Sequence, residues 1–176
     1  AAKNLARANI GEILVLEREQ QAGGIPRHSD HLGYGIRDRK RFMSGPAYAR
    51  LLVAEAERAG AQIMTQTMVT GWSDARTLIA TSPQGRIRIH PEVVLFATGA
   101  RERPRTAQLI VGDRPAGILT TGQLQNLVHL KGEKVGSKAV IVNAELVSWS
   151  AALTLKQSGS KVAALVTTYP RSESYG

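Results

Sequence analysis

The chain has 176 residues, and its 23 lysines and arginines against 14 aspartates and glutamates give a net charge of +9. A hydrophobic fraction of 43% is typical of a globular protein and argues against disorder. No apolar run approaches the ~20 residues of a membrane-spanning helix, and the first residues are not expected to form a signal peptide. The absence of cysteine excludes disulfides, thiolate metal sites and CxxC redox pairs, and leaves the cytoplasm as the default location.

Basic residues are spread along the chain, with denser patches at residues 37–41 and 101–105 that also contain acids. Aromatic residues make up only 5% of the chain and do not alternate with basic ones as in a base-stacking motif. The composition therefore does not favour nucleic-acid binding. The patches are expected to contact an anionic cofactor or a partner surface, or to be solvated.

The N-terminal part predicts the second half of a βαβ unit. Residues 1–8 are rich in helix formers, and Asn-Ile-Gly at 9–11 ends that helix. Residues 12–17 contain four consecutive branched apolar residues, which are typical of a parallel strand buried on both faces. The first strand of such a unit is expected upstream of residue 1, so the chain is interpreted as an internal fragment.

The middle of the chain predicts one helix and a group of strands. Ser-Gly-Pro begins a helix at residue 44, and Gly60 ends it. Short strands are expected at 61–72, 77–82 and 86–90, with a Pro-Gln-Gly turn between the last two. The apolar residues 93–97 predict a further strand that is buried on both faces.

The C-terminal part predicts a second βαβ unit. Residues 101–117, rich in arginine, proline and glycine, are interpreted as a connection between domains. A helix is expected at 121–130. The βαβ unit follows at 138–166, with its helix at 145–157.

Glu17 stands at the C-terminal end of the first predicted strand. A carboxylate there can accept hydrogen bonds from both hydroxyls of an adenosine ribose, as in dinucleotide-binding folds. The alternative is a solvated charge at a strand end. Gly23-Gly24 and Thr98-Gly99 permit close approach of the backbone to a ligand, or else are ordinary turns.

Three segments together resemble a known family: Leu-Glu-Arg-Glu at 16–19, the Gly23-Gly24 pair, and Val-Leu-Phe-Ala-Thr-Gly-Ala at 94–100. They resemble the FAD-dependent pyridine nucleotide-disulfide oxidoreductases. Gly-Ala-Arg-Glu-Arg-Pro at 99–104 is similar to cysteine-free members, the flavoprotein subunits of opine oxidase, hydrogen cyanide synthase and heterotetrameric sarcosine oxidase.

The resemblance covers nearly the whole chain and implies an α/β fold of the FAD/NAD(P)-binding Rossmann-like, three-layer type. It implies a small β-meander insertion and two partial dinucleotide-binding domains, at residues 1–110 and 111–176. The implied cofactor is FAD. Its adenosine ribose would lie at Glu17 and Arg18, its adenine at the backbone of Met68-Val69, and its pyrophosphate near residues 97–99. The cofactor-binding residues implied are Glu17, Arg18, Gly23, Gly24, Val69, Ala97, Thr98 and Gly99.

In disulfide reductases of this family, the segment after the glycine pair carries the redox cysteines. Here residues 25–28 read Ile-Pro-Arg-His, so disulfide reduction is excluded. His28 becomes a candidate acid/base beside the flavin ring, with an exposed loop histidine as the alternative. His28 and His31 have the spacing of metal ligands, but no carboxylate cluster accompanies them, and no metal site is predicted.

The turn of the second βαβ unit departs from the G-x-G-x-x-G pattern. Asn143, Glu145 and Ser148 occupy the glycine positions. Glu145 places negative charge where a pyrophosphate would approach, and like charges repel. This domain is therefore expected to have an NAD(P)-binding fold without tight NAD(P)H binding.

The resemblance implies a fragment of an FAD-dependent oxidoreductase that passes a hydride from an amine, opine or similar small substrate to flavin. The alternative is a non-catalytic remnant that dimerises or docks on a second subunit. Nonspecific nucleic-acid binding is a weaker third interpretation. Because a partner strand is expected to be missing, the isolated chain is predicted to be a dimer or larger, or poorly ordered within residues 1–40.

Overall fold

The computed structural model describes residues 1–168 and 170, in which no helix is long and apolar enough to cross a membrane. The chain divides into two compact units. The first comprises Ala1–Gly24 and Ala49–Thr98, and the second comprises Ile25–Tyr48 and Gly99–Gly176. The domain boundary expected after residue 110 stays a prediction.

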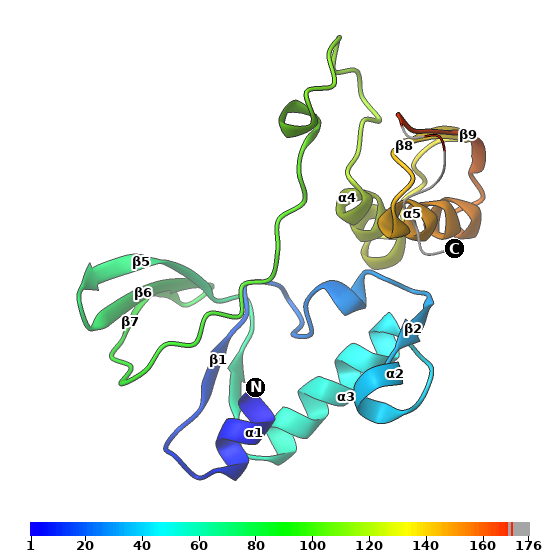
Figure 1. The fold of residues 1–176 in the computed structure, drawn as a ribbon. Coiled ribbons are helices and arrows are strands. Elements are labelled where there is room, and N and C mark those ends of the chain that lie inside the picture. The colour runs from blue at the N-terminus through cyan, green and yellow to red at the C-terminus, as the bar shows by residue number, and fades with distance from the viewer. Residues whose placement is uncertain (169, 171–176) are drawn as a thin grey trace. The chain divides into compact units, whose positions relative to one another are not determined.

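The first unit contains a parallel strand pair with a helical connection (Figure 1). Strands β1 (Leu14–Leu16) and β4 (Gln62–Met64) pair in parallel, with Val15 opposite Ile63. Helix α3 (Gly45–Arg58) precedes β4, as parallel pairing requires a crossover connection. Helix α1 (Ala2–Arg7) lies against α3, because Lys3 Nζ of α1 donates to Glu55 Oε2 of α3 at 3.1 Å.

The rest of this unit is an antiparallel sheet in the order β5-β6-β7, which confirms the predicted β-meander. Its strands are β5 (Met68–Asp74), β6 (Thr77–Ser82) and β7 (Gly85–Ile89). The central strand carries the core, since Leu78, Ile79 and Ala80 are all buried. The single strand expected at 61–72 is two strands instead. Gln66, with φ of 51°, separates them, because a left-handed residue interrupts extended backbone.

The second unit begins with four short elements and continues with several helices and a parallel strand pair. Its early elements are η1 (Ile25–Arg27), β2 (Leu32–Tyr34), α2 (Ile36–Arg39) and β3 (Met43–Ser44). Its later ones are η2 (Arg105–Gln108), α4 (Thr121–Gln125), the π-helical η3 (Asn126–Leu130), β8 (Lys138–Val142), α5 (Leu146–Gln157) and β9 (Lys161–Val166).

The predicted second βαβ unit is present. Strands β8 and β9 pair in parallel, with Ile141 opposite Leu165, and α5 connects them (Figure 1). The core of the unit is formed by Leu124, Ile141, Ala151 and Leu155. The helix expected at 121–130 begins at a capping box, in which the Thr120 hydroxyl accepts from the backbone N–H of Gln123. It changes to π-helical geometry at Asn126.

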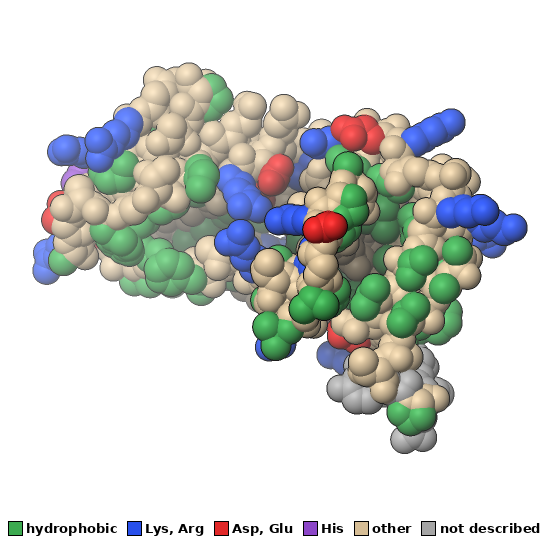
Figure 2. All heavy atoms as spheres, turned by 90° about the horizontal axis from the view of Figure 1, so that it is seen from above, with side chains coloured by type: hydrophobic (Ala, Val, Ile, Leu, Met, Phe, Trp, Pro, Cys, Tyr) green, Lys and Arg blue, Asp and Glu red, His purple; other side chains and the backbone are tan. Residues whose placement is uncertain are grey.

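The strand expected at residues 93–97 is not formed. This stretch has no regular secondary structure, and the exposed fractions of Val93, Leu95 and Phe96 are 85%, 60% and 74%. A strand buried on both faces needs neighbours on both sides, and the described part of the chain supplies none here. Figure 2 shows further hydrophobic side chains at the surface, among lysines and arginines.

Candidate functional site

Glu17 is held at the carboxyl end of β1 by backbone and side-chain contacts. Its N–H donates to Met64 O at 2.9 Å, and its carbonyl accepts from Thr67 N at 2.9 Å. Its side chain is half-buried, and Oε1 accepts from the backbone N–H of Glu19 at 2.9 Å. These bonds extend the pairing of β1 by one residue and fix the carboxylate at the strand end.

Arg18, implied beside the ribose, and Val69, implied at the adenine, are both exposed. Arg18 forms an ion pair with Glu19 at 3.4 Å, and its side chain is 70% exposed, so this pair contributes little to stability. Val69 lies on β5, two residues beyond Thr67, and is 41% exposed. The structure thus brings the segment that carries Val69 to the backbone of Glu17.

The glycines implied in cofactor binding adopt positive φ. Gly23, Gly24 and Gly99 have φ of 127°, 61° and 70°. A Cβ at Gly24 or Gly99 would meet nothing within 4 Å, so backbone conformation rather than crowding favours glycine there. Ala97 and Thr98 are exposed and outside regular structure. Of the implied residues, Gly99 and His28 belong to the second unit, and the others belong to the first.

His28 directly follows η1 and is half-buried, with its backbone N–H donating to Ile25 O at 2.9 Å. Nearby, His31 Nδ1 lies 2.9 Å from Leu32 O, and its ring is 5.7 Å from that of Tyr34. In residues 1–168 and 170, no three histidine, aspartate or glutamate side chains gather as metal ligands.

A buried polar network that sequence reasoning missed anchors the segment around His28. Ser29 Oγ donates to Gln125 Oε1 at 3.3 Å, and Gln125 Nε2 donates to Ser150 Oγ at 2.8 Å. Ser29 and Gln125 are each only 4% exposed. Gln157 Nε2 also donates to Asp30 O at 2.9 Å. No local pattern in the sequence singles out Gln125, because its partners Ser29 and Ser150 lie 96 and 25 residues away.

His129 lies on the π-helical turn η3, a type of turn that is frequent at functional sites. Its Nε2 is 3.2 Å from Thr154 Oγ1, and Thr154 is 1% exposed. Burial lowers the pKa of His129 from its ordinary value, Asp30 opposes this change, and His31 adds to it. The lowered pKa favours the neutral form of the His129 ring that lies beside Thr154.

The turn after β8 leads into α5 without a glycine, and the three residues that occupy the expected glycine positions differ in burial and backbone conformation. Asn143 has φ of 80°, and its N–H donates to Val166 O at 2.8 Å. Ala144 is buried, whereas Glu145 is exposed at the N-cap of α5. Ser148 is also buried, and its N–H donates to Glu145 O at 3.0 Å.

We expect this turn to depend on a residue that tolerates left-handed backbone. Asn143→Val should lower the free energy of unfolding by about 1–2 kcal/mol, because β-branched residues strongly disfavour positive φ. Asn143→Gly should preserve stability. Urea denaturation of both variants is the measurement. Equal stability of the valine and glycine variants would show that the turn does not need this conformation.

Comparison with protein-family models finds no match, and neither does comparison with curated proteins. Solved structures do match. L-proline dehydrogenase from P. horikoshii aligns with a TM-score of 0.70 at 12% identity, over 93% of this chain and 32% of that one. The NAD-dependent persulfide reductase from A. fulgidus aligns at 0.51 and 20% identity, over 93% and 32%. The water-forming NADH oxidase from Lactobacillus brevis aligns at 0.51 and 16% identity, over 97% and 38%.

These likenesses establish the fold. The chain has an α/β fold of the FAD/NAD(P)-binding Rossmann-like type, as the resemblance had implied. It spans about a third of the length of the solved structures named above.

Proposed function

We propose that the chain is part of an FAD-dependent oxidoreductase whose flavin accepts a hydride from an amine, opine or similar small substrate. The observation that carries this proposal is the half-buried Glu17 at the carboxyl end of a parallel strand in a Rossmann-like fold. That position is where dinucleotide-binding folds place the acid that holds the adenosine ribose. In the same proposal, the parent protein of this chain is one of the cysteine-free flavoprotein subunits.

The residues present fit one part of FAD. The Glu17 carboxylate matches the ribose diol, because an ionised carboxylate can accept several hydrogen bonds. In the same unit, Gly23 and Gly24 offer backbone without side chains along the cofactor. The sequence contains no G-x-G-x-x-G phosphate loop, so this chain supplies only part of the pyrophosphate contacts that a dinucleotide requires.

In this proposal, different residues of the chain bind and orient different parts of FAD and the substrate. Glu17 orients the adenosine end, and the backbone of Val69, on the edge strand β5, offers hydrogen-bonding groups to adenine. His28 is the candidate for holding a proton near the substrate, in a segment that the Ser29–Gln125 hydrogen bond fixes. The flavin, when bound, supplies the redox chemistry.

Glu17→Ala should weaken FAD binding by about 1–3 kcal/mol, since it removes an acceptor and leaves the ribose hydroxyls unpaired. Fluorescence titration of FAD into both proteins is the measurement. Glu19→Ala is the matched control. The backbone N–H of Glu19 donates to Glu17 and is kept in the variant, and the Glu19 side chain takes part only in an exposed ion pair. Equal affinity of the Glu17 variant and the unchanged chain would remove Glu17 from the ribose role.

The second candidate function is a non-catalytic module that associates with a second subunit or another copy. The observation that favours it is the exposed apolar side chains of the first unit, including Val93 at 85% and Phe96 at 74%. Exposed patches of this kind mark interaction sites.

For NAD(P)H, the exposed Glu145 carboxylate at the start of α5 disfavours a bound pyrophosphate, so we propose that FAD is the cofactor.

A further inference from the structure

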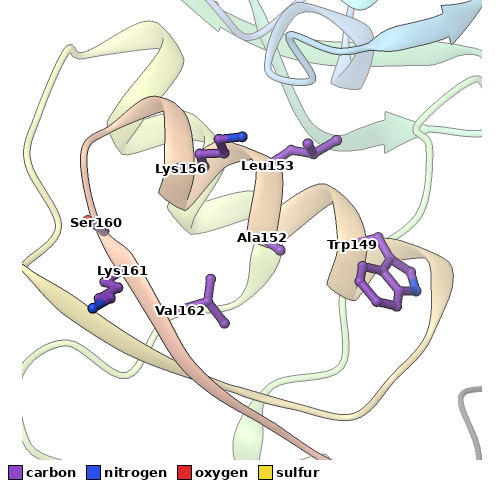
Figure 3. Close-up of a pocket in the computed structure, with 7 residues that line it drawn as sticks. All are labelled: Trp149, Ala152, Leu153, Lys156, Ser160, Lys161 and Val162. Carbon is purple, nitrogen blue, oxygen red and sulfur yellow. The ribbon is translucent and has the colours of Figure 1, made fainter.

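Helix α5 carries a row of polar side chains, which we call its polar stripe: Ser150, Thr154 and Gln157. Residues at this spacing share one face of a helix. Trp149 and Leu153 lie on another face, the outer face of α5, where they line a pocket beside β9 (Figure 3). No residue of the polar stripe lines that pocket, so the stripe is a separate feature of the helix.

Each residue of the polar stripe contacts a different segment of the second unit. Ser150 Oγ accepts from Gln125 Nε2 of α4 at 2.8 Å. Thr154 Oγ1 lies 3.2 Å from a histidine ring nitrogen of η3. Gln157 Nε2 donates to the carbonyl oxygen of Asp30 at 2.9 Å. The polar stripe thus joins α5 to α4, to η3 and to the segment that follows η1.

The segment after η1 carries His28, whose backbone is fixed on both sides. Before His28, its N–H closes a turn by donating to Ile25 O at 2.9 Å. After it, Ser29 Oγ donates to Gln125 Oε1 at 3.3 Å, and the next carbonyl accepts from the polar stripe. All of these contacts lie within the second unit. They are formed by described residues alone and do not depend on what covers the rest of the chain.

Gln125 uses both ends of one amide group to connect the segment to the helix. Its oxygen accepts from Ser29, and its nitrogen donates to Ser150. Gln125 and Ser29 are each 4% exposed, so water has little access to this bond. Apolar groups of the same shape can replace a buried hydrogen-bonded pair with little loss of stability. They do not replace its direction, because a hydrogen bond weakens steeply when donor and acceptor are misaligned.

We propose that Gln125 is a positioning residue for His28: it holds Ser29 in register with α5, so that the His28 ring keeps one orientation. The proposal rests on the proposed function for the role of His28, which is to hold a proton near the substrate. The orientation itself depends only on contacts within the second unit, so it is measured without flavin.

Histidine ring signals in two-dimensional NMR spectra report this orientation. The chain has four histidines, and His28→Gln identifies the His28 signal by its loss. Gln125→Leu should shift or split the His28 signal, and should speed the amide exchange of His28 and Ser29 at least about tenfold. The signal of His90, which lies in the first unit, should stay in place and serves as the internal control.

A triple variant separates positioning from stability. It combines Ser29→Ala, Gln125→Leu and Ser150→Ala, which leaves no hydroxyl of this network without its partner. Urea denaturation should therefore show that most of the stability lost in Gln125→Leu returns. The His28 signal should remain displaced, because no directional bond returns with it. Gln84→Leu makes the same chemical change at an exposed residue of the first unit and should leave the His28 signal unchanged.

Three results would overturn the proposal. The first is an unchanged His28 signal in Gln125→Leu. The second is a native His28 signal in the triple variant, which would mean that the network only stabilises the unit. The third is an equal shift of that signal in Gln84→Leu. Where Gln125→Leu unfolds the chain and displaces His90 as well, the triple variant decides. Failure of the unchanged chain to bind FAD would refute the proposed function instead, and these signals, recorded without flavin, distinguish the two failures.

Discussion

Gly45→Ala is expected to destabilise the second unit by about 3 kcal/mol, at the upper end of the usual range for overpacking. Gly45 is buried, and a Cβ there would overlap the carbonyl oxygens of Pro26 and Ser29 and lie 3.0 Å from Tyr34 Cε2. Two of these neighbours are backbone atoms, so no side-chain rotation relieves the overlap. The segment that carries His28 would have to move.

Gly71→Ala is the matched control for this prediction. Gly71 has no positive φ, and a Cβ there would meet nothing within 4 Å. Its replacement should change the free energy of unfolding by less than about 0.5 kcal/mol. Urea denaturation measures both variants, and amide exchange over Arg27 to Ser29 locates the effect. A Gly45 variant as stable as the Gly71 variant would contradict the close packing of this segment.

Leu155→Ala is expected to lower the free energy of unfolding by about 2–5 kcal/mol, because it opens a cavity in the core formed with Leu124 and Ile141. Leu153→Ala makes the same chemical change two residues earlier on the exposed face of α5, where it should cost less than about 0.5 kcal/mol. Denaturation of the two variants side by side tests the assignment of faces. Similar losses for both would mean that the outer face is covered in the isolated chain.

The elements that the sequence predicted well are those defined by local pattern. The strand predicted at 12–17 and the βαβ unit predicted at 138–166 are each marked by a pattern within one short window. Both form, although β1 is shorter than predicted and half-buried rather than buried on both faces. The β-meander is equally local, because its strands are joined by tight turns such as that at Gly85. Such features need no knowledge of distant residues.

The features that escaped prediction depend on distant neighbours. Residues 93–97 have the pattern of a buried strand, but burial requires flanking strands, and Phe96 is exposed in this structure. The contact of Ser29 with Gln125 spans 96 residues along the sequence, so no local pattern announces it. At the candidate site, position after a strand singled out Glu17, whereas the anchoring of the His28 segment appears only in three dimensions.

Equilibrium dialysis of the 176-residue chain against FAD and against FMN tests the central claim most directly. FMN carries the same flavin ring but lacks the adenosine that Glu17 is proposed to hold. The account predicts that FAD is retained at least about tenfold more strongly than FMN, the equivalent of one well-made hydrogen-bonding contact to a charged group. Equal retention of the two flavins, or retention of neither, would contradict it.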